Sequence, residues 1–114
     1  MPNTRIIAIT LTKYIFRIPK LTHFFTHIIH ALIWATSIYF IPETSIDFNK
    51  FGDAVYFSLV TFTSLGYGDL TISSPWRMLS GIEAINGIML IGWSTALMYS
   101  LIQKLFSSLN FRSK

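Results

Sequence analysis

The 19 residues from Phe51 to Asp69, FGDAVYFSLVTFTSLGYGD, decide how the chain folds. The stretch up to Leu65 is apolar and aromatic, and turn-prone sequence flanks it. From Asp53 to Thr63 the chain would extend about 16 Å as a helix. This is too short to cross a membrane and predicts a re-entrant helix. Asp53 suits the N-terminal cap or first turn of that helix, because an acid is favourable at the positive end of the helix dipole.

Long apolar runs lie on both sides of this stretch. Phe24 to Ile41 contains no Asp, Glu, Lys or Arg and would span about 27 Å as a helix, close to the roughly 30 Å hydrocarbon thickness of a bilayer. Met78 to Ile102 would span about 37 Å, and its one charged residue is Glu83. Neither run resembles a signal peptide. The sequence therefore predicts an all-α membrane protein with two transmembrane helices around a re-entrant pore helix.

The composition agrees with a membrane protein and excludes several functions. Hydrophobic residues make up 52% of the 114-residue chain, charged residues make up 12%, and the mean hydropathy is +0.52. Average soluble proteins are about a quarter charged, so the composition argues against a disordered chain and a water-soluble enzyme. Without cysteine there is no disulfide, thiolate zinc site or cysteine nucleophile. Without a nucleotide-binding loop or catalytic triad, the sequence predicts no enzyme.

The basic residues predict the orientation in the membrane. Seven lie on the terminal sides of the two spans and two lie between them, whereas four of the five acids lie between. The positive-inside rule then puts both termini in the cytoplasm and the connecting loop, residues 43–77, outside. The basic residues are Arg5, Lys13, Arg17 and Lys20 before the first span, Lys50 and Arg77 in the loop, and Lys104, Arg112 and Lys114 after the second span.

The tetrapeptide GYGD, residues 66–69, follows the short helix at membrane depth. Non-helical backbone at this depth must be buried in protein or line a water-filled path, because lipid cannot satisfy its polar groups. Residues 61–69, TFTSLGYGD, resemble the selectivity filter of potassium channels. The order of pore helix, filter and helix over residues 51–102 is similar to the two-transmembrane pore module of tetrameric potassium channels, as in small prokaryotic potassium channels.

The resemblance implies a passive, potassium-selective homotetramer in the cell membrane, with a plasma or inner membrane as the expected location. Rings of backbone carbonyls from four chains would replace the water of a dehydrated potassium ion, and no other metal, cofactor or nucleic acid is expected. Glycines in the filter suit its alternating backbone conformation, because glycine takes positive φ readily. The implied ion-binding residues are Ser64, Leu65, Gly66, Tyr67 and Gly68, with Thr63 and Asp69 as support.

Departures from the family pattern leave alternatives open. The usual Thr-Val before Gly-Tyr-Gly is Ser64-Leu65 here, and this favours a weakly selective sodium and potassium channel as an alternative. Val60 stands where some members place a carboxylate, and the usual proline after GYGD is absent. A non-conducting membrane subunit is the other alternative, but two glycines in a re-entrant loop argue against it.

The second apolar run contains Gly87 and Gly92. Two interpretations of Gly87 remain open: a gating hinge, as the resemblance implies, or a site of close helix packing. If Gly87 is the hinge, four residues are expected to line the inner cavity, where the Thr95 hydroxyl would meet a hydrated ion. These residues are Ile88, Ile91, Thr95 and Tyr99.

Two sets of titratable residues lie in or beside the predicted spans. Glu83 is a candidate functional residue, because carboxylates are rare inside membranes. It could instead reach interfacial water, pair with Arg77 or, with Asn86, support the pore helix from behind, and a structural role is favoured. Three histidines share a face of the first predicted helix. They could form an acid sensor, or two of them could bind a metal ion. The favoured interpretation is that they are neutral and lie at the lipid headgroups or between helices. They are His23, His27 and His30.

The predicted organisation has eight segments. They are an amphipathic cytoplasmic segment (1–22) that ends near Pro19, an outer transmembrane helix (23–41), an extracellular turret (42–52), a pore helix (53–63), a filter (64–69), an outer loop (70–76), an inner transmembrane helix (77–106) and a cytoplasmic tail (107–114). No arginine-rich voltage-sensing helix is present. We therefore expect gating through the inner helices and filter, or a chain that is the pore portion of a longer protein.

Overall fold

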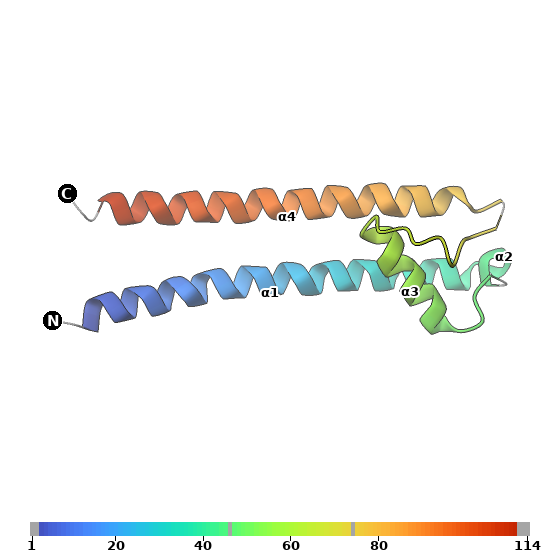
Figure 1. Cartoon of the computed structure of the whole chain (residues 1–114), viewed down its shortest axis with the longest axis horizontal. Coiled ribbons are helices and arrows are strands. Elements are labelled where there is room, and N and C mark those ends of the chain that lie inside the picture. Colours follow the sequence, from blue (N-terminus) through green and yellow to red (C-terminus); the bar gives the residue numbers. More distant parts are fainter. Residues whose placement is uncertain (1–2, 46, 74, 112–114) are drawn as a thin grey trace. The chain divides into compact units, whose positions relative to one another are not determined.

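A computed structural model describes residues 3–45, 47–73 and 75–111 of the chain. In these ranges all regular structure is helical: α1 (Asn3–Phe40), α2 (Pro42–Ser45), α3 (Phe51–Phe62) and α4 (Met78–Phe111) (Figure 1). The all-α prediction is thus confirmed for the described residues. Arg112 and Lys114, which contribute to the predicted orientation, lie outside the described residues, as does the end of the predicted tail.

The chain forms two compact units. One consists of residues 27–93, which include the second half of α1, all of α2 and α3, the connecting loops and the first part of α4. The other consists of the part of α1 up to Thr26 and the part of α4 from Ser94 onward. The candidate filter, α3 and Gly87 therefore belong to the same unit.

Helix α1 continues through Pro19 without interruption, so the expected end of the N-terminal segment near this residue is wrong. Proline removes one helical hydrogen bond and crowds the carbonyl four residues earlier. The turns on both sides keep their own bonds, and the Thr22 hydroxyl also donates to the carbonyl of Ile18 at 2.9 Å. One missing bond in a helix of 38 residues does not end it.

Helix α3 begins two residues earlier than predicted and ends one residue earlier. Lys50 is its N-cap, and the Lys50 N–H donates to Asp53 Oδ2 at 3.2 Å. Asp53 is therefore the first-turn acid that the sequence predicted, not the cap itself. The predicted turret also contains the short helix α2 and gives up its last two residues to α3.

Helix α4 begins one residue later than predicted and continues past residue 106, so residues 107–111 of the predicted tail are helical. Nothing in this stretch stops a helix, since it contains neither glycine nor proline. The hydroxyls of Ser107 and Ser108 each donate to a carbonyl three residues earlier at 2.8 Å, which keeps them inside the helical pattern.

A small apolar core holds the unit of residues 27–93 together around the N-terminal half of α3. Its buried side chains come from α1, the α2–α3 connection, α3 and the segment after the filter. The rings of Phe48 and Phe57 lie 5.4 Å apart, and Trp34 packs against the same cluster. The buried members are Ile38, Phe48, Ala54, Phe57 and Ile72.

One helix of the described residues, Met78–Ser108 within α4, is long and apolar enough to cross a membrane, with a mean hydropathy of 1.5. Helix α3 is apolar but too short to do so, as predicted. Helix α1 is not among the described helices that meet this length and hydropathy. The outer span over residues 23–41 therefore stays a prediction.

Candidate functional site

The end of α3 leads directly into the candidate filter through a Schellman motif. The Ser64 N–H donates to the carbonyl of Thr61 at 2.9 Å, and the Leu65 N–H donates to that of Val60 at 2.9 Å. The Gly66 N–H reaches the same Val60 oxygen at 3.2 Å. This motif needs a left-handed residue after the C-cap, and Ser64 occupies that position with φ +59°. The start of the candidate filter is thus anchored to the last turn of α3.

Backbone conformation alternates along the candidate filter. Ser64, Gly66 and Gly68 have φ values of +59°, +55° and +76°, whereas the residues between them do not have positive φ. The positive φ expected at both glycines is confirmed, and Ser64 is an unexpected third case. Serine rarely adopts this conformation. Here the Schellman motif at the end of α3 explains it, because the motif requires a left-handed residue at this position. An alternating backbone is what the resemblance to a selectivity filter implied for these residues.

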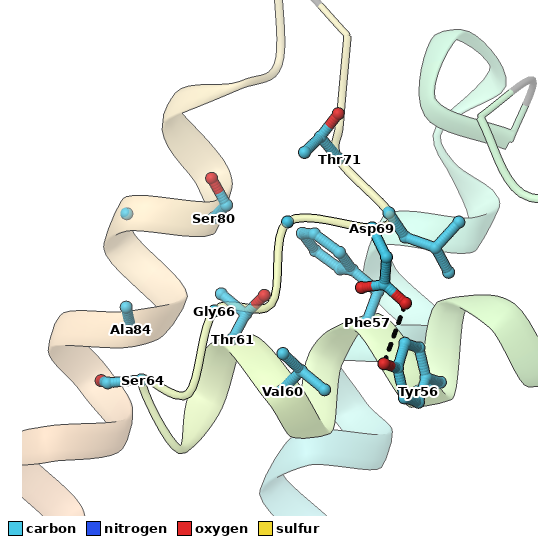
Figure 2. Close-up of a pocket in the computed structure, with 13 residues that line it drawn as sticks. Tyr56, Phe57, Val60, Thr61, Ser64, Gly66, Asp69, Thr71, Ser80 and Ala84 are labelled. Atoms are coloured by element: carbon cyan, nitrogen blue, oxygen red, sulfur yellow. Dashed lines mark hydrogen bonds between the residues drawn. The ribbon is translucent and has the colours of Figure 1, made fainter.

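The candidate filter is exposed in the single chain. Every residue from Thr63 to Asp69 is exposed, and the Leu65 and Tyr67 side chains are 57% and 67% accessible. Ser64, Gly66 and Gly68 line a cavity of about 340 Å³, together with α3 and the first turns of α4 (Figure 2). One chain therefore places the predicted ion-binding residues in one continuous loop but leaves that loop accessible to solvent.

Asp69 holds the far end of the candidate filter against α3. Tyr56 Oη donates to Asp69 Oδ2 at 2.9 Å, and Figure 2 shows the loop running back along α3 to make this contact. This hydrogen bond joins the loop after Gly68 to the middle of α3. The candidate filter is therefore attached to α3 at both ends. The roles of Asp69 and Thr63 as filter support stay predictions.

A second contact, which the sequence analysis missed, ties the turret to the outer loop. Asp47 accepts hydrogen bonds from the Ser73 N–H at 2.8 Å and from the Ser73 hydroxyl at 2.6 Å. These donors lower the pKa of Asp47 below its ordinary value, because they stabilise the carboxylate. The two residues lie 26 positions apart, and no local pattern in the sequence relates them.

Gly87 is a point of close contact between α4 and the end of α3. A Cβ at this position would overlap the carbonyl oxygen of Phe62 and lie 2.7 Å from its carbonyl carbon. At Gly92 a Cβ would meet nothing within 4 Å. The packing interpretation of Gly87 thus has direct structural support, and the hinge stays a prediction.

The residues expected to line the inner cavity lie along α4 in both compact units. Ile88 and Ile91 belong to the unit of residues 27–93 and are 59% and 39% exposed. Thr95 and Tyr99 belong to the other unit, where Tyr99 Oη accepts a hydrogen bond from Gln103 at 2.9 Å. Their exposure is compatible with lining a path, and their assignment stays a prediction.

His27 and Glu83 take structural positions. The His27 ring lies 6.0 Å from the Phe62 ring, so at least this histidine packs between helices. Within the described residues no group of three or more potential metal ligands gathers. Glu83 is fully buried and makes no ion pair among the described residues, so the expectations of interfacial water and of pairing with Arg77 are wrong.

Comparison with known proteins identifies the class. Residues 22–104 match the family described as Ion channel. Because the match covers most of the chain, the chain belongs to this ion channel family, and it is a helical membrane protein and not an enzyme.

Among curated proteins, the chain is 31% identical over 68 residues to the voltage-gated potassium channel regulatory subunit KCNG3 of Homo sapiens, and equally to that of Mus musculus. The match covers 59% of this chain but 16% of each relative. No solved structure gives a significant match.

Proposed function

We propose that the chain is the pore-forming subunit of a potassium-selective channel. The observation that carries this proposal is the alternation of positive φ at Ser64, Gly66 and Gly68, in a loop anchored at both ends to a short apolar helix. Backbone carbonyls aligned along one side can replace the hydration shell of a cation. Membership of the ion channel family supports ion permeation as the activity.

Four copies complete the site in this proposal. The exposed side of residues 63–69 needs partners, because one loop contributes one wall of a path. A homotetramer would bring four such loops to a common axis and enclose potassium in rings of carbonyl oxygens. Ser64 Oγ then completes the innermost site, and the exposed Tyr67 ring packs on a neighbouring subunit.

The same proposal places the chain in a plasma or inner membrane. Residues 23–41 form the outer span and α4 the inner span, and both termini lie in the cytoplasm, since the basic residues favour that side. Gly87 and the residues expected to line the cavity then lie on the inner half of the path. Potassium and membrane lipids are the partners besides the other three copies.

Cation flux in proteoliposomes tests the proposal. Purified protein is reconstituted into vesicles loaded with potassium, and flux is compared under potassium and sodium gradients with and without barium. Potassium-dependent flux that barium blocks is the expected result. Equal sodium and potassium flux would favour the weakly selective alternative, which Ser64-Leu65 motivates.

A regulatory, non-conducting subunit is the second candidate function. The observation that favours it is the name of the similar KCNG3 proteins, which are described as regulatory subunits. Against it stand the two glycines with positive φ, which a purely structural subunit does not need. Crosslinking in mild detergent separates the two: tetramers of this chain alone support the pore, and a stable monomer supports the regulatory subunit.

A further inference from the structure

The proposed function assigns no role to a buried acid in α4. Glu83 is 0% exposed, and neither of its carboxyl oxygens has a hydrogen bond within the described residues. Ser58 in α3 is also 0% exposed, and its hydroxyl, which likewise has no bond, faces the Glu83 carboxyl. Buried polar groups without partners are rare, so this facing pair calls for an explanation.

The chemistry of the two groups is complementary if Glu83 is neutral. An ionised carboxylate that is buried without a counter-charge costs several kcal/mol, and the described residues provide no cation to Glu83. A protonated acid has one O–H donor and further acceptor capacity, and a serine hydroxyl both donates and accepts. A hydrogen bond from the acid to Ser58 Oγ, with the serine donating in return, satisfies both side chains.

The pair lies in register with the Gly87 contact. Gly87 follows Glu83 by one helical turn, and Phe62 follows Ser58 by one turn, so α4 meets α3 at two successive levels. Between these levels lies Val60, whose carbonyl accepts the N–H groups of Leu65 and Gly66 in the candidate filter. The position of α3 on α4 therefore sets the position of the base of the filter.

We propose that Glu83 is a positioning residue for the filter, a neutral acid that hydrogen-bonds to Ser58 and fixes α3 against α4. Glu83 does not touch the ion. It acts through α3, and its effect on permeation comes from the carbonyls that follow Val60. This inference rests on the proposed function, because the filter role of residues 64–68 belongs to that proposal.

A double-mutant cycle on the reconstituted channel tests this role. The variants are Glu83→Leu, Ser58→Ala, the double variant and Glu83→Gln, and the readouts are the potassium-to-sodium permeability ratio and the rate of thermal tetramer dissociation. Glu83→Leu and Ser58→Ala are each expected to lower the ratio and speed dissociation by about fivefold or more, because each leaves a buried polar group unpaired or removes the bond. The double variant is expected to be no worse than the worse single variant.

Glu83→Gln is the rescue variant, since a neutral amide still donates and accepts, and it is expected to retain most of the wild-type ratio. Ser107→Ala is the control, because the Ser107 hydroxyl donates to the carbonyl of Lys104 within α4. Losses that add in the double variant, or a Gln variant as damaged as the Leu variant, would overturn the proposal. If Glu83→Leu does not assemble, Ser58→Ala and Glu83→Gln still show whether loss of the hydrogen bond lowers the permeability ratio and whether a neutral amide retains it.

An infrared measurement keeps this test separate from the proposed function. The difference spectrum of wild type against Glu83→Gln is expected to contain the carbonyl band of a protonated carboxylic acid. Absence of that band would overturn the neutral acid, whether or not the protein conducts. A wild-type protein that carries no flux but shows the band would contradict the channel proposal, while the neutral, buried state of Glu83 would stand.

Discussion

The filter segment, residues 64–69, and the contact between α3 and α4 both depend on glycine, but for different physical reasons. At Gly66 a Cβ would meet nothing within 4 Å, yet φ is +55°. At Gly87 the backbone is ordinary helix, but a Cβ would overlap the Phe62 carbonyl. The first glycine is required by local backbone conformation and the second by a tertiary contact.

The two regions also differ in how complete they are. The α3–α4 contact is buried within one chain, with Ser58, Phe62 and Glu83 all nearly inaccessible. The filter segment is exposed on one side and needs further copies in the proposed channel. Damage at the contact should therefore appear as lost stability, with any change in permeation following from the displaced α3, whereas damage at the filter should appear as lost conduction in an assembled protein.

Gly87→Ala is expected to have the largest effect on stability. The new methyl group meets backbone, which cannot rotate away, so α4 must shift, at a cost of about 3 kcal/mol. Thermal unfolding in detergent measures this, with Gly92→Ala as the matched control, since it meets nothing and gains up to about 1 kcal/mol of helix propensity. An unchanged melting temperature with altered open probability would contradict the packing interpretation and favour the hinge.

Gly66→Ala is expected to abolish conduction while the oligomer persists. The side chain has room, so the cost is the strain of positive φ, about 1–2 kcal/mol. Relief of that strain would turn the neighbouring carbonyls out of line. Flux and crosslinking are measured together, with Gly52→Ala as the control, because Gly52 lies in α3 without positive φ or close neighbours. Normal currents in Gly66→Ala would refute the filter assignment.

Changes at the Tyr56–Asp69 hydrogen bond are expected to have an intermediate effect. Tyr56→Phe removes the donor and should loosen the outer end of the filter, seen as faster loss of current during prolonged recording. Asp69→Asn keeps an acceptor but removes a negative charge, so conductance should fall at low salt and recover as salt screens the difference. If the two variants behave identically at all salt concentrations, the hydrogen bond and the charge are not separate contributions.

The smallest expected effect is the pH dependence of the Asp47–Ser73 contact. Hydrogen bonds from Ser73 lower the pKa of Asp47 in the folded chain, so their contribution is fully present above the ordinary pKa of 3.8 and is lost as the pH falls below it. Melting temperatures between about pH 5 and pH 3 measure this loss. Ser73→Ala removes one of the two donors and should reduce the slope, and an equally steep slope in Asp47→Asn would assign it to another group.

Local sequence predicted the elements that local physics controls. The short apolar stretch forms a helix, Asp53 lies in its first turn, and both filter glycines have positive φ. The positive φ of Ser64 was not predicted, because the left-handed position of a Schellman motif is usually occupied by glycine. The continuity of α1 through Pro19 was also not predicted. Local rules treat a proline as a helix end, but a long helix tolerates the loss of one hydrogen bond.

The sequence by itself determined the order of helices around GYGD, the apolar character of the chain and the glycines of the filter, because each depends on residues close together in the chain. Only the tertiary structure decided that Gly87 receives the Phe62 carbonyl, that Glu83 faces Ser58 and that Asp47 binds Ser73. These contacts join residues 25 or 26 positions apart. Spacing within a helix says which residues share a face, but only packing decides which face meets which partner.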